Sequence, residues 1–121
     1  MAQEIADRRD IDFVIWEKMK GEELLKYDIY KDFNRKACDM IITEARKLAI
    51  KEMLPTLQEG DREGVKYENG AVKVPECFHR VHQMLLEGEW GNLSVPAEMG
   101  GQGAPGLASA AAVEYFMGAN W

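Results

Sequence analysis

The chain has 121 residues, of which 46% are hydrophobic, and a formal net charge of −6 at pH 7. This length suits one small domain or a piece of a larger one, and the hydrophobic content is too high for a disordered chain. Lysine and arginine are absent from residue 81 onward, and the earlier basic residues are interleaved with acids. We therefore expect no nucleic-acid partner, because a phosphate-binding surface needs clustered positive charge.

Targeting signals are absent from the sequence as it stands. No apolar run approaches the ~20 residues that a helix needs to span a bilayer, and residues 1–12 lack the apolar segment of a secretory signal peptide. Cys38 and Cys77 are the only cysteines, and in such a chain they are expected to be free thiols. These features predict a soluble, cytoplasmic protein with no membrane span.

The N-terminal region, residues 1–31, is expected to be an extension with short helices. Asp10 or Asp12 is the expected N-cap of the first helix, which Gly21 ends. The expected inward-facing residues of this helix are Phe13, Val14, Trp16 and Met19. Helices of this length are too short to be stable alone, so they must pack on the rest of the chain.

The strongest predicted helix follows, with Asp32 as its N-cap and a length of about 22 residues. Apolar residues recur there at three- and four-residue spacing, which is typical of one buried face. They are Phe33, Ala37, Met40, Ile41, Ala45, Leu48 and Ala49. A charge at Met40 is therefore expected to unfold the chain. Pro55 is expected to end the helix, because the residue before a proline is pushed out of helical geometry.

A polar loop over residues 59–64 and a β-hairpin over residues 65–74 come next. Asn69 and Gly70 suit the type I′ turn of a two-residue hairpin loop. This turn places Tyr67 opposite Val72, and residue 65 opposite residue 74, on one face. Since a lone hairpin is marginal in water, this face is expected to rest on the helices.

Two helices and a glycine-rich connection complete the predicted fold. The first begins at Pro75 and ends at Gly88. Its expected buried residues are Phe78, Val81, His82, Leu85 and Leu86. The connection covers residues 88–106, and a helix over residues 107–117 follows, rich in alanines that would let another helix approach closely. We assign residues 32–121 to an all-α helical bundle with one short hairpin. The apolar end of the sequence predicts a cut from a longer chain.

The glycine-rich connection contains the spelling of a dinucleotide-binding loop. Residues 101–106 read G-x-G-x-x-G. That loop needs a strand before it and an acidic residue about 20 positions later. Neither is present, because Pro96 interrupts the preceding segment and the sequence ends too soon. A turn between helices is the favoured interpretation.

A possible metal site involves residues of the predicted helix after Pro75. Glu76 and His79 have the Glu-x-x-His spacing of di-iron bundles, and Cys77 and His82 lie near them. A second such pair is missing, so surface histidines are the favoured interpretation. Cys77 near a helix start could have a lowered thiol pKa, and Ser94 and Ser109 lie in no nucleophile-elbow context. We assign no catalytic, cofactor-binding or metal-binding residue.

Several segments together resemble the acyl-CoA dehydrogenase family, and its long subgroup with 3-methylthiopropanoyl-CoA dehydrogenase-like enzymes in particular. Residues 95–105 match the pattern P-x-E-x-G-G-Q-G-x-P found between early helices of that family. Softer similarity covers nearly the whole chain. Its segments are residues 9–14, 23–25, 59–64, 74–78 and 87–90.

The resemblance implies an incomplete N-terminal helical domain of an FAD enzyme that dehydrogenates acyl-CoA thioesters at the α and β carbons. It also implies electron-transferring flavoprotein as acceptor, and middle and C-terminal domains that hold the flavin and the catalytic carboxylate. Only a structural turn is carried over to this chain. Its residues are Gly100, Gly101, Gln102, Gly103 and Pro105. This chain alone is expected to bind no FAD, to be inactive and to form homo-oligomers. The alternatives are a self-associating interaction module and, less favoured, a metal-binding helical bundle.

Overall fold

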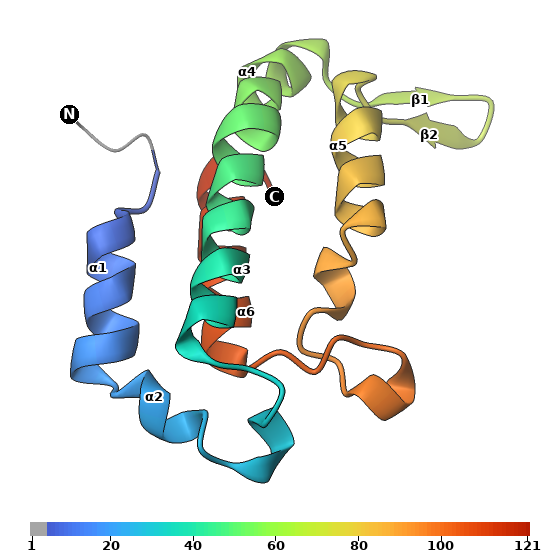
Figure 1. The fold of residues 1–121 in the computed structure, drawn as a ribbon. Coiled ribbons are helices and arrows are strands. Elements are labelled where there is room, and N and C mark those ends of the chain that lie inside the picture. The colour runs from blue at the N-terminus through green and yellow to red at the C-terminus, as the bar shows by residue number, and fades with distance from the viewer. Residues whose placement is uncertain (1–4) are drawn as a thin grey trace.

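The computed structural model describes residues 5–121 and is helical with one two-stranded hairpin, which confirms the expected all-α class (Figure 1). Residues 1–4 of the predicted extension lie outside the described residues. The helices are α1 (Arg8–Asp12), α2 (Gly21–Leu24), α3 (Arg35–Leu48), α4 (Leu54–Glu63), α5 (Cys77–Glu87) and α6 (Gly106–Ala119). The strands are β1 (Lys66–Glu68) and β2 (Ala71–Lys73).

The first helix begins earlier than predicted and buries a different face. Asp7 is its N-cap and accepts a hydrogen bond from the amide of Arg9 at 2.7 Å. The expected caps Asp10 and Asp12 lie inside α1, and a π-helical segment, Phe13–Lys18, continues it. The buried residues are Ile11, Ile15 and Trp16. The expected inward positions Phe13, Val14 and Met19 are exposed, so only Trp16 was predicted correctly.

The long helix runs through Pro55, so the prediction that this proline ends it is wrong. Asn34, and not Asp32, caps α3 by accepting a hydrogen bond from the amide of Ala37 at 2.8 Å. A π-helical segment, Ala49–Met53, joins α3 to α4. This segment changes the hydrogen-bond spacing and leaves Pro55 in the first turn of α4, where a missing N–H is tolerated. The predicted polar loop at residues 59–64 is therefore helical up to Glu63.

The buried face of the long helix lies about one residue away from the predicted one. Its buried residues are Cys38, Ile42, Ala45, Ala49, Met53, Thr56 and Gly60. Ala45 and Ala49 were predicted correctly, whereas Met40 is 61% exposed. The burial on which the expected unfolding by a charge at Met40 rested is therefore contradicted. Two apolar stripes overlap in this sequence, and a shift of one residue turns a helix by about 100°.

The core forms where α6 packs along α3 and the π-helical segment after it, as the alanine-rich sequence of α6 predicted (Figure 1). Ala108 and Ala112 are buried at this contact, and small side chains allow the two backbones to approach closely. Tyr115 and Phe116 fill the space beside them. The ring of Trp90, from the glycine-rich connection, meets Phe116 edge-on at 5.2 Å.

The hairpin has the predicted register but not the predicted packing. Tyr67 pairs with Val72, and both Asn69 and Gly70 have positive φ, as a type I′ turn requires. Tyr67 is 74% exposed and Val72 is 64% exposed, so their face does not rest on the helices. Figure 1 shows the hairpin extending away from the helices, next to α5.

Helix α5 ends at Gly88, as predicted, but it begins after Pro75 and not at this residue. Glu76 is the N-cap, and Pro75 is buried one residue ahead of it. Val81 is buried, but the predicted buried residues His82 and Leu86 are exposed. The ring of Phe78 lies against Gly60 of α4, where a larger residue would collide with it.

Candidate functional site

The glycine-proline turn at residues 100–105 is held by its own backbone. The amides of five successive residues donate hydrogen bonds of 2.8–3.1 Å to backbone carbonyls of residues 92–97. The donors are Gly100, Gly101, Gln102, Gly103 and Ala104. Gln102 adds side-chain contacts from Nε2 to the carbonyl oxygens of Gly88 and Glu89, at 3.5 and 3.3 Å. Pro105 is fully buried at the start of α6.

The glycines of this turn are required by conformation and by space. Gly100 and Gly103 have φ values of 85° and 64°, which L-residues with a side chain rarely adopt. A Cβ at Gly101 would collide with the carbonyl of Val95. Because the amides that a phosphate would need already donate to carbonyls, the turn does not fit the pyrophosphate of FAD or of another dinucleotide.

The predicted metal candidates do not converge. His79 Nδ1 lies 3.1 Å from Glu76 Oε2 on the exposed side of α5, and His82 is one turn further along this helix. Among residues 5–121, no group of three or more His, Cys, Asp or Glu side chains could hold a metal ion.

The two cysteines are free thiols. The expected lowering of the Cys77 pKa is wrong: desolvation raises this pKa, and the carboxylates of Glu59 and Glu63 raise it further. Burial likewise raises the pKa of the Cys38 thiol in α3. A thiolate nucleophile is therefore disfavoured at both cysteines.

The two serines lie on different elements. Ser94 lies in the connection before Ala97–Met99, and Ser109 lies in the first turn of α6.

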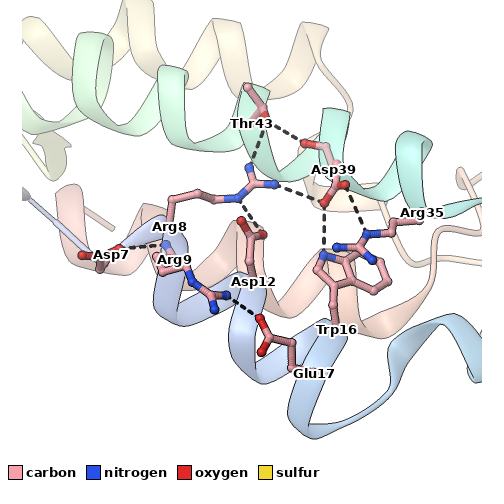
Figure 2. A network of polar contacts seen from close by, with 9 residues as sticks. All are labelled: Asp7, Arg8, Arg9, Asp12, Trp16, Glu17, Arg35, Asp39 and Thr43. Atoms are coloured by element: carbon pink, nitrogen blue, oxygen red, sulfur yellow. Dashed lines mark hydrogen bonds and ion pairs between the residues drawn. The ribbon is translucent and has the colours of Figure 1, made fainter.

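The most connected polar cluster is one that sequence reasoning did not identify, and it is centred on Asp39 of α3 (Figure 2). Asp39 Oδ1 accepts from Arg8 Nη2 at 3.2 Å and from Trp16 Nε1 at 3.1 Å. Arg8 also donates from Nε to Asp12 at 2.8 Å and from Nη1 to Thr43 at 2.9 Å. One guanidinium thus connects α1 to two successive turns of α3.

A second arginine completes this cluster from the side of α3. The guanidinium of Arg35 lies 5.0 Å from the ring centroid of Trp16, donates to Glu22 of α2 at 2.6 Å, and has its Nε 3.8 Å from Asp39 Oδ2. The i, i+4 spacings of Arg8 with Asp12 and of Asp39 with Thr43 were visible in the sequence. Their meeting across 31 residues was not, because no local pattern encodes it. The carboxylates of the cluster are paired with cations, so the cluster acts as an anchor.

Two apolar grooves flank the core. One, of about 460 Å³, lies between the first helix and α6, and its lining includes Ile11, Val14, Ile15, Leu107 and Ala111. The other, of about 470 Å³, lies between α4, α5 and the end of α6. Its lining includes Met53, Phe78, Val81, Leu85 and Trp121. The first groove has no hydroxyl, thiol or imidazole in its lining. The second is also lined by Thr56, His82 and Asn120. The Thr56 hydroxyl donates to the carbonyl oxygen of Met53 at 2.7 Å and accepts from Asn120 Nδ2 at 2.8 Å, so its hydrogen bonds are made within the fold.

No helix among residues 5–121 is both long enough and apolar enough to cross a membrane.

Comparison with known proteins adds one relative. No protein-family model matches the chain. The chain is 30% identical over 112 residues, or 93% of its length, to a 3-methylmercaptopropionyl-CoA dehydrogenase from Ruegeria pomeroyi. The match spans 19% of that protein, so the chain covers about a fifth of its relative. As its motifs predicted, this chain is similar, over nearly all of its own length, to a part of an acyl-CoA dehydrogenase.

Proposed function

We propose that this chain acts as a helical segment of a flavin-dependent acyl-CoA dehydrogenase and supplies scaffold but no reacting group. The supporting observation is the match of 93% of this chain to 19% of the relative. In this proposal residues 32–121 belong to the N-terminal helical domain and residues 1–31 extend it. The whole enzyme would remove hydrogens from the α and β carbons of an acyl-CoA thioester in the cytoplasm and pass electrons to electron-transferring flavoprotein.

The flavin, in this proposal, is held by the middle and C-terminal domains and not by this segment. Bound FAD would supply a hydride acceptor to the whole enzyme. The turn at residues 100–105 offers FAD no free amides, because all five amides of residues 100–104 donate internally. The role proposed for this turn is to fix where α6 begins, since Ala104 and Pro105 are buried directly before Gly106.

A flavin-retention and turnover assay tests this proposal. The purified chain is incubated with FAD, desalted and scanned for flavin absorbance, and is then assayed with 3-methylmercaptopropionyl-CoA and an artificial electron acceptor. We expect no retained flavin and no turnover, while a protein that contains this segment together with the remaining domains shows both. Stoichiometric flavin on the chain alone, or thioester oxidation by it, would overturn the scaffold role.

Self-association is the second candidate function, and exposed apolar residues favour it. Trp121 is 70% exposed at the edge of the groove between α4 and α5, and Met117 is exposed on α6. Exposed apolar patches of this kind drive assembly. Size-exclusion chromatography with light scattering tests this candidate: a mass that rises above one chain at micromolar concentration supports it, and a strict monomer counts against it.

A further inference from the structure

The segment Arg8–Lys18, here called the N-terminal arm, comprises α1 and the π-helical segment that follows. Its only backbone hydrogen bonds are local, and among residues 5–121 none joins the arm to α3 or α6. The arm is also too short to be a stable helix alone. It therefore keeps its structure only while its side chains hold it against the core.

The apolar part of this attachment is incomplete. Ile11, Ile15 and Trp16 are buried, but a groove of about 460 Å³ remains between the arm and α6. On that side of the arm Val14 is exposed and lines the groove. The gain from burying so few side chains is of the same order as the entropic cost of ordering the arm.

The polar part of the attachment is concentrated on Asp39 of α3, with Thr43 and Arg35 of the same helix beside it. Asp39 accepts from both Arg8 and Trp16, which are two turns apart on the arm (Figure 2). Thr43 Oγ1 accepts a further hydrogen bond from Arg8 Nη1 at 2.9 Å. Lys20, with φ of 52°, lies between the arm and α2, and the contact between Glu22 and Arg35 ties α2 to α3 independently of the arm. If the arm detached from the core with Lys20 as the hinge, the contact between Glu22 and Arg35 would remain.

From these contacts we propose that the N-terminal arm is a releasable strap, held closed by the Asp39 cluster, that can leave α3 and α6 while the rest of the fold stays intact. Its release is an order-to-disorder transition, because the free arm loses its helical structure. It uncovers the side of α6 that carries Leu107 and Ala111, which now face the groove. Since the cluster consists of ion pairs and charged hydrogen bonds at partly exposed side chains, rising salt opens the strap. This inference does not depend on the proposed enzyme family.

The arm itself contains a matched pair of variants. Arg8 reaches across to Asp39 and Thr43, whereas its neighbour Arg9 pairs with Glu17 inside the arm at 2.6 Å. Arg8→Gln and Arg9→Gln therefore remove the same charge from adjacent positions, and only the first removes side-chain contacts with the core. The hydrogen bond from Trp16 to Asp39 remains in both variants. A charged hydrogen bond is strong enough that Arg8→Gln should lower the ratio of closed to released arm by about tenfold or more.

Amide and indole NMR spectra of the full chain test the strap. At low salt we expect the Trp16 indole N–H, identified by its loss in Trp16→Phe, to be protected by Asp39 in wild type and in Arg9→Gln. In Arg8→Gln, and in wild type at high salt, we expect the resonances of residues 8–18 to move toward random-coil shifts while those of α3 and α6 keep theirs. An arm that stays closed in Arg8→Gln and at high salt overturns the proposal. So does an arm that is lost only together with α3 and α6.

Discussion

At the level of single residues, two apolar stripes on α3 lie about one residue apart, and only contact with α6 decides which one is buried. Met40 and Ile42 are both apolar, but Met40 is 61% exposed and Ile42 is 0% exposed. Residues from both stripes appear in the regular spacing of the sequence. The spacing therefore predicts the helix correctly and leaves its rotation undetermined, because rotation depends on a partner 60 or more residues away.

The two stripes lead to opposite outcomes for the same substitution. Met40→Asp should change the free energy of unfolding by less than about 0.5 kcal/mol, since an exposed position carries little packing. Lys36 and Glu44, one turn before and after it, offset each other. Ile42→Asp should cost more than about 4 kcal/mol because it buries an unpaired charge. Urea denaturation of both variants measures the contrast, and a large loss in Met40→Asp alone would reverse the assigned rotation.

Tyr115 carries an unusual buried group, a hydroxyl with no hydrogen-bond partner among residues 5–121. Burial raises its pKa above the ordinary value of about 10. The unfolded chain thus loses this proton at a lower pH than the folded protein, so stability falls as pH rises above about 10.

Tyr115→Phe removes both the unpartnered hydroxyl and its titration. We expect unfolding free energy at neutral pH to stay the same or to rise by about 1 kcal/mol, and the alkaline loss of stability to shrink. Cys38, whose pKa is also raised by burial, leaves a residual loss. Tyr67→Phe, at a 74% exposed position, is the control and should change neither quantity. Thermal melts at a series of pH values from neutral to alkaline measure both quantities. A steeper loss of stability at alkaline pH in Tyr115→Phe than in wild type would refute the role given to the buried hydroxyl.

At the level of elements, local signals predicted turns better than helix ends. The register of β1 and β2 followed from Asn69 and Gly70 alone, because a two-residue type I′ turn fixes which residues face each other. Helix starts were predicted wrongly where several aspartates or asparagines compete as N-caps. A helix end was predicted wrongly at Pro55, because a proline usually ends a helix. The π-helical segment Ala49–Met53 that accommodates this proline has no comparable local signal.

The turn at residues 100–105 should resist even the smallest side chain at one of its glycines. A Cβ at Gly101 meets the backbone of Val95, which cannot move without breaking the hydrogen bonds of the turn. Gly101→Ala should therefore cost about 1–3 kcal/mol. Gly91→Ala is the control, because nothing lies near its added Cβ. Equal unfolding midpoints in urea for the two variants would show that the turn is less constrained than its contacts indicate.

The contact between α4 and α5 depends on Gly60, whose missing side chain makes room for the ring of Phe78. Gly60→Ala should cost about 1–3 kcal/mol by overpacking. In a Phe78→Ala background the same change should become neutral or stabilising by up to about 1 kcal/mol, since alanine is the better helix former. A double-mutant cycle by chemical denaturation measures this coupling. A coupling energy near zero would mean that the two helices do not meet at this point.

On the scale of the whole molecule, the class of fold was predictable and its long-range contacts were not. The spacing of apolar residues and the identity of turn residues are local features of the sequence. They predicted the all-α class, the hairpin and the close packing of α6 on another helix. The cluster around Asp39 joins residues 31 positions apart, and the exposure of the hairpin depends on where α5 lies. The family resemblance came from the motif at residues 95–105, and the hydrogen bonds within this turn have no local pattern in the sequence.

Stability should be distributed unevenly over this fold, with α3 and α6 as its most protected part. Most fully buried side chains lie on these two helices and on the π-helical segment between α3 and α4. The hairpin, in contrast, has both strands exposed. Lys73 lies opposite the like charge of Lys66 and pairs with Glu68 at 3.0 Å, and such exposed pairs contribute little to stability. The hairpin amides should therefore exchange through local opening that needs almost no free energy, whereas α3 and α6 should exchange only by global unfolding.

Native-state hydrogen exchange across a range of low urea concentrations measures this distribution. The opening free energies of the α3 and α6 amides should equal the free energy of global unfolding and should fall with urea as steeply as that free energy does. The opening free energies of the β1 and β2 amides should be much smaller and nearly independent of urea. Asn69→Ala, which forces alanine into a positive-φ position of the turn, should further loosen the hairpin and leave exchange in α3 unchanged. If the hairpin amides instead exchange as slowly as those of α3, the hairpin is covered in solution and its exposed face must contact another surface.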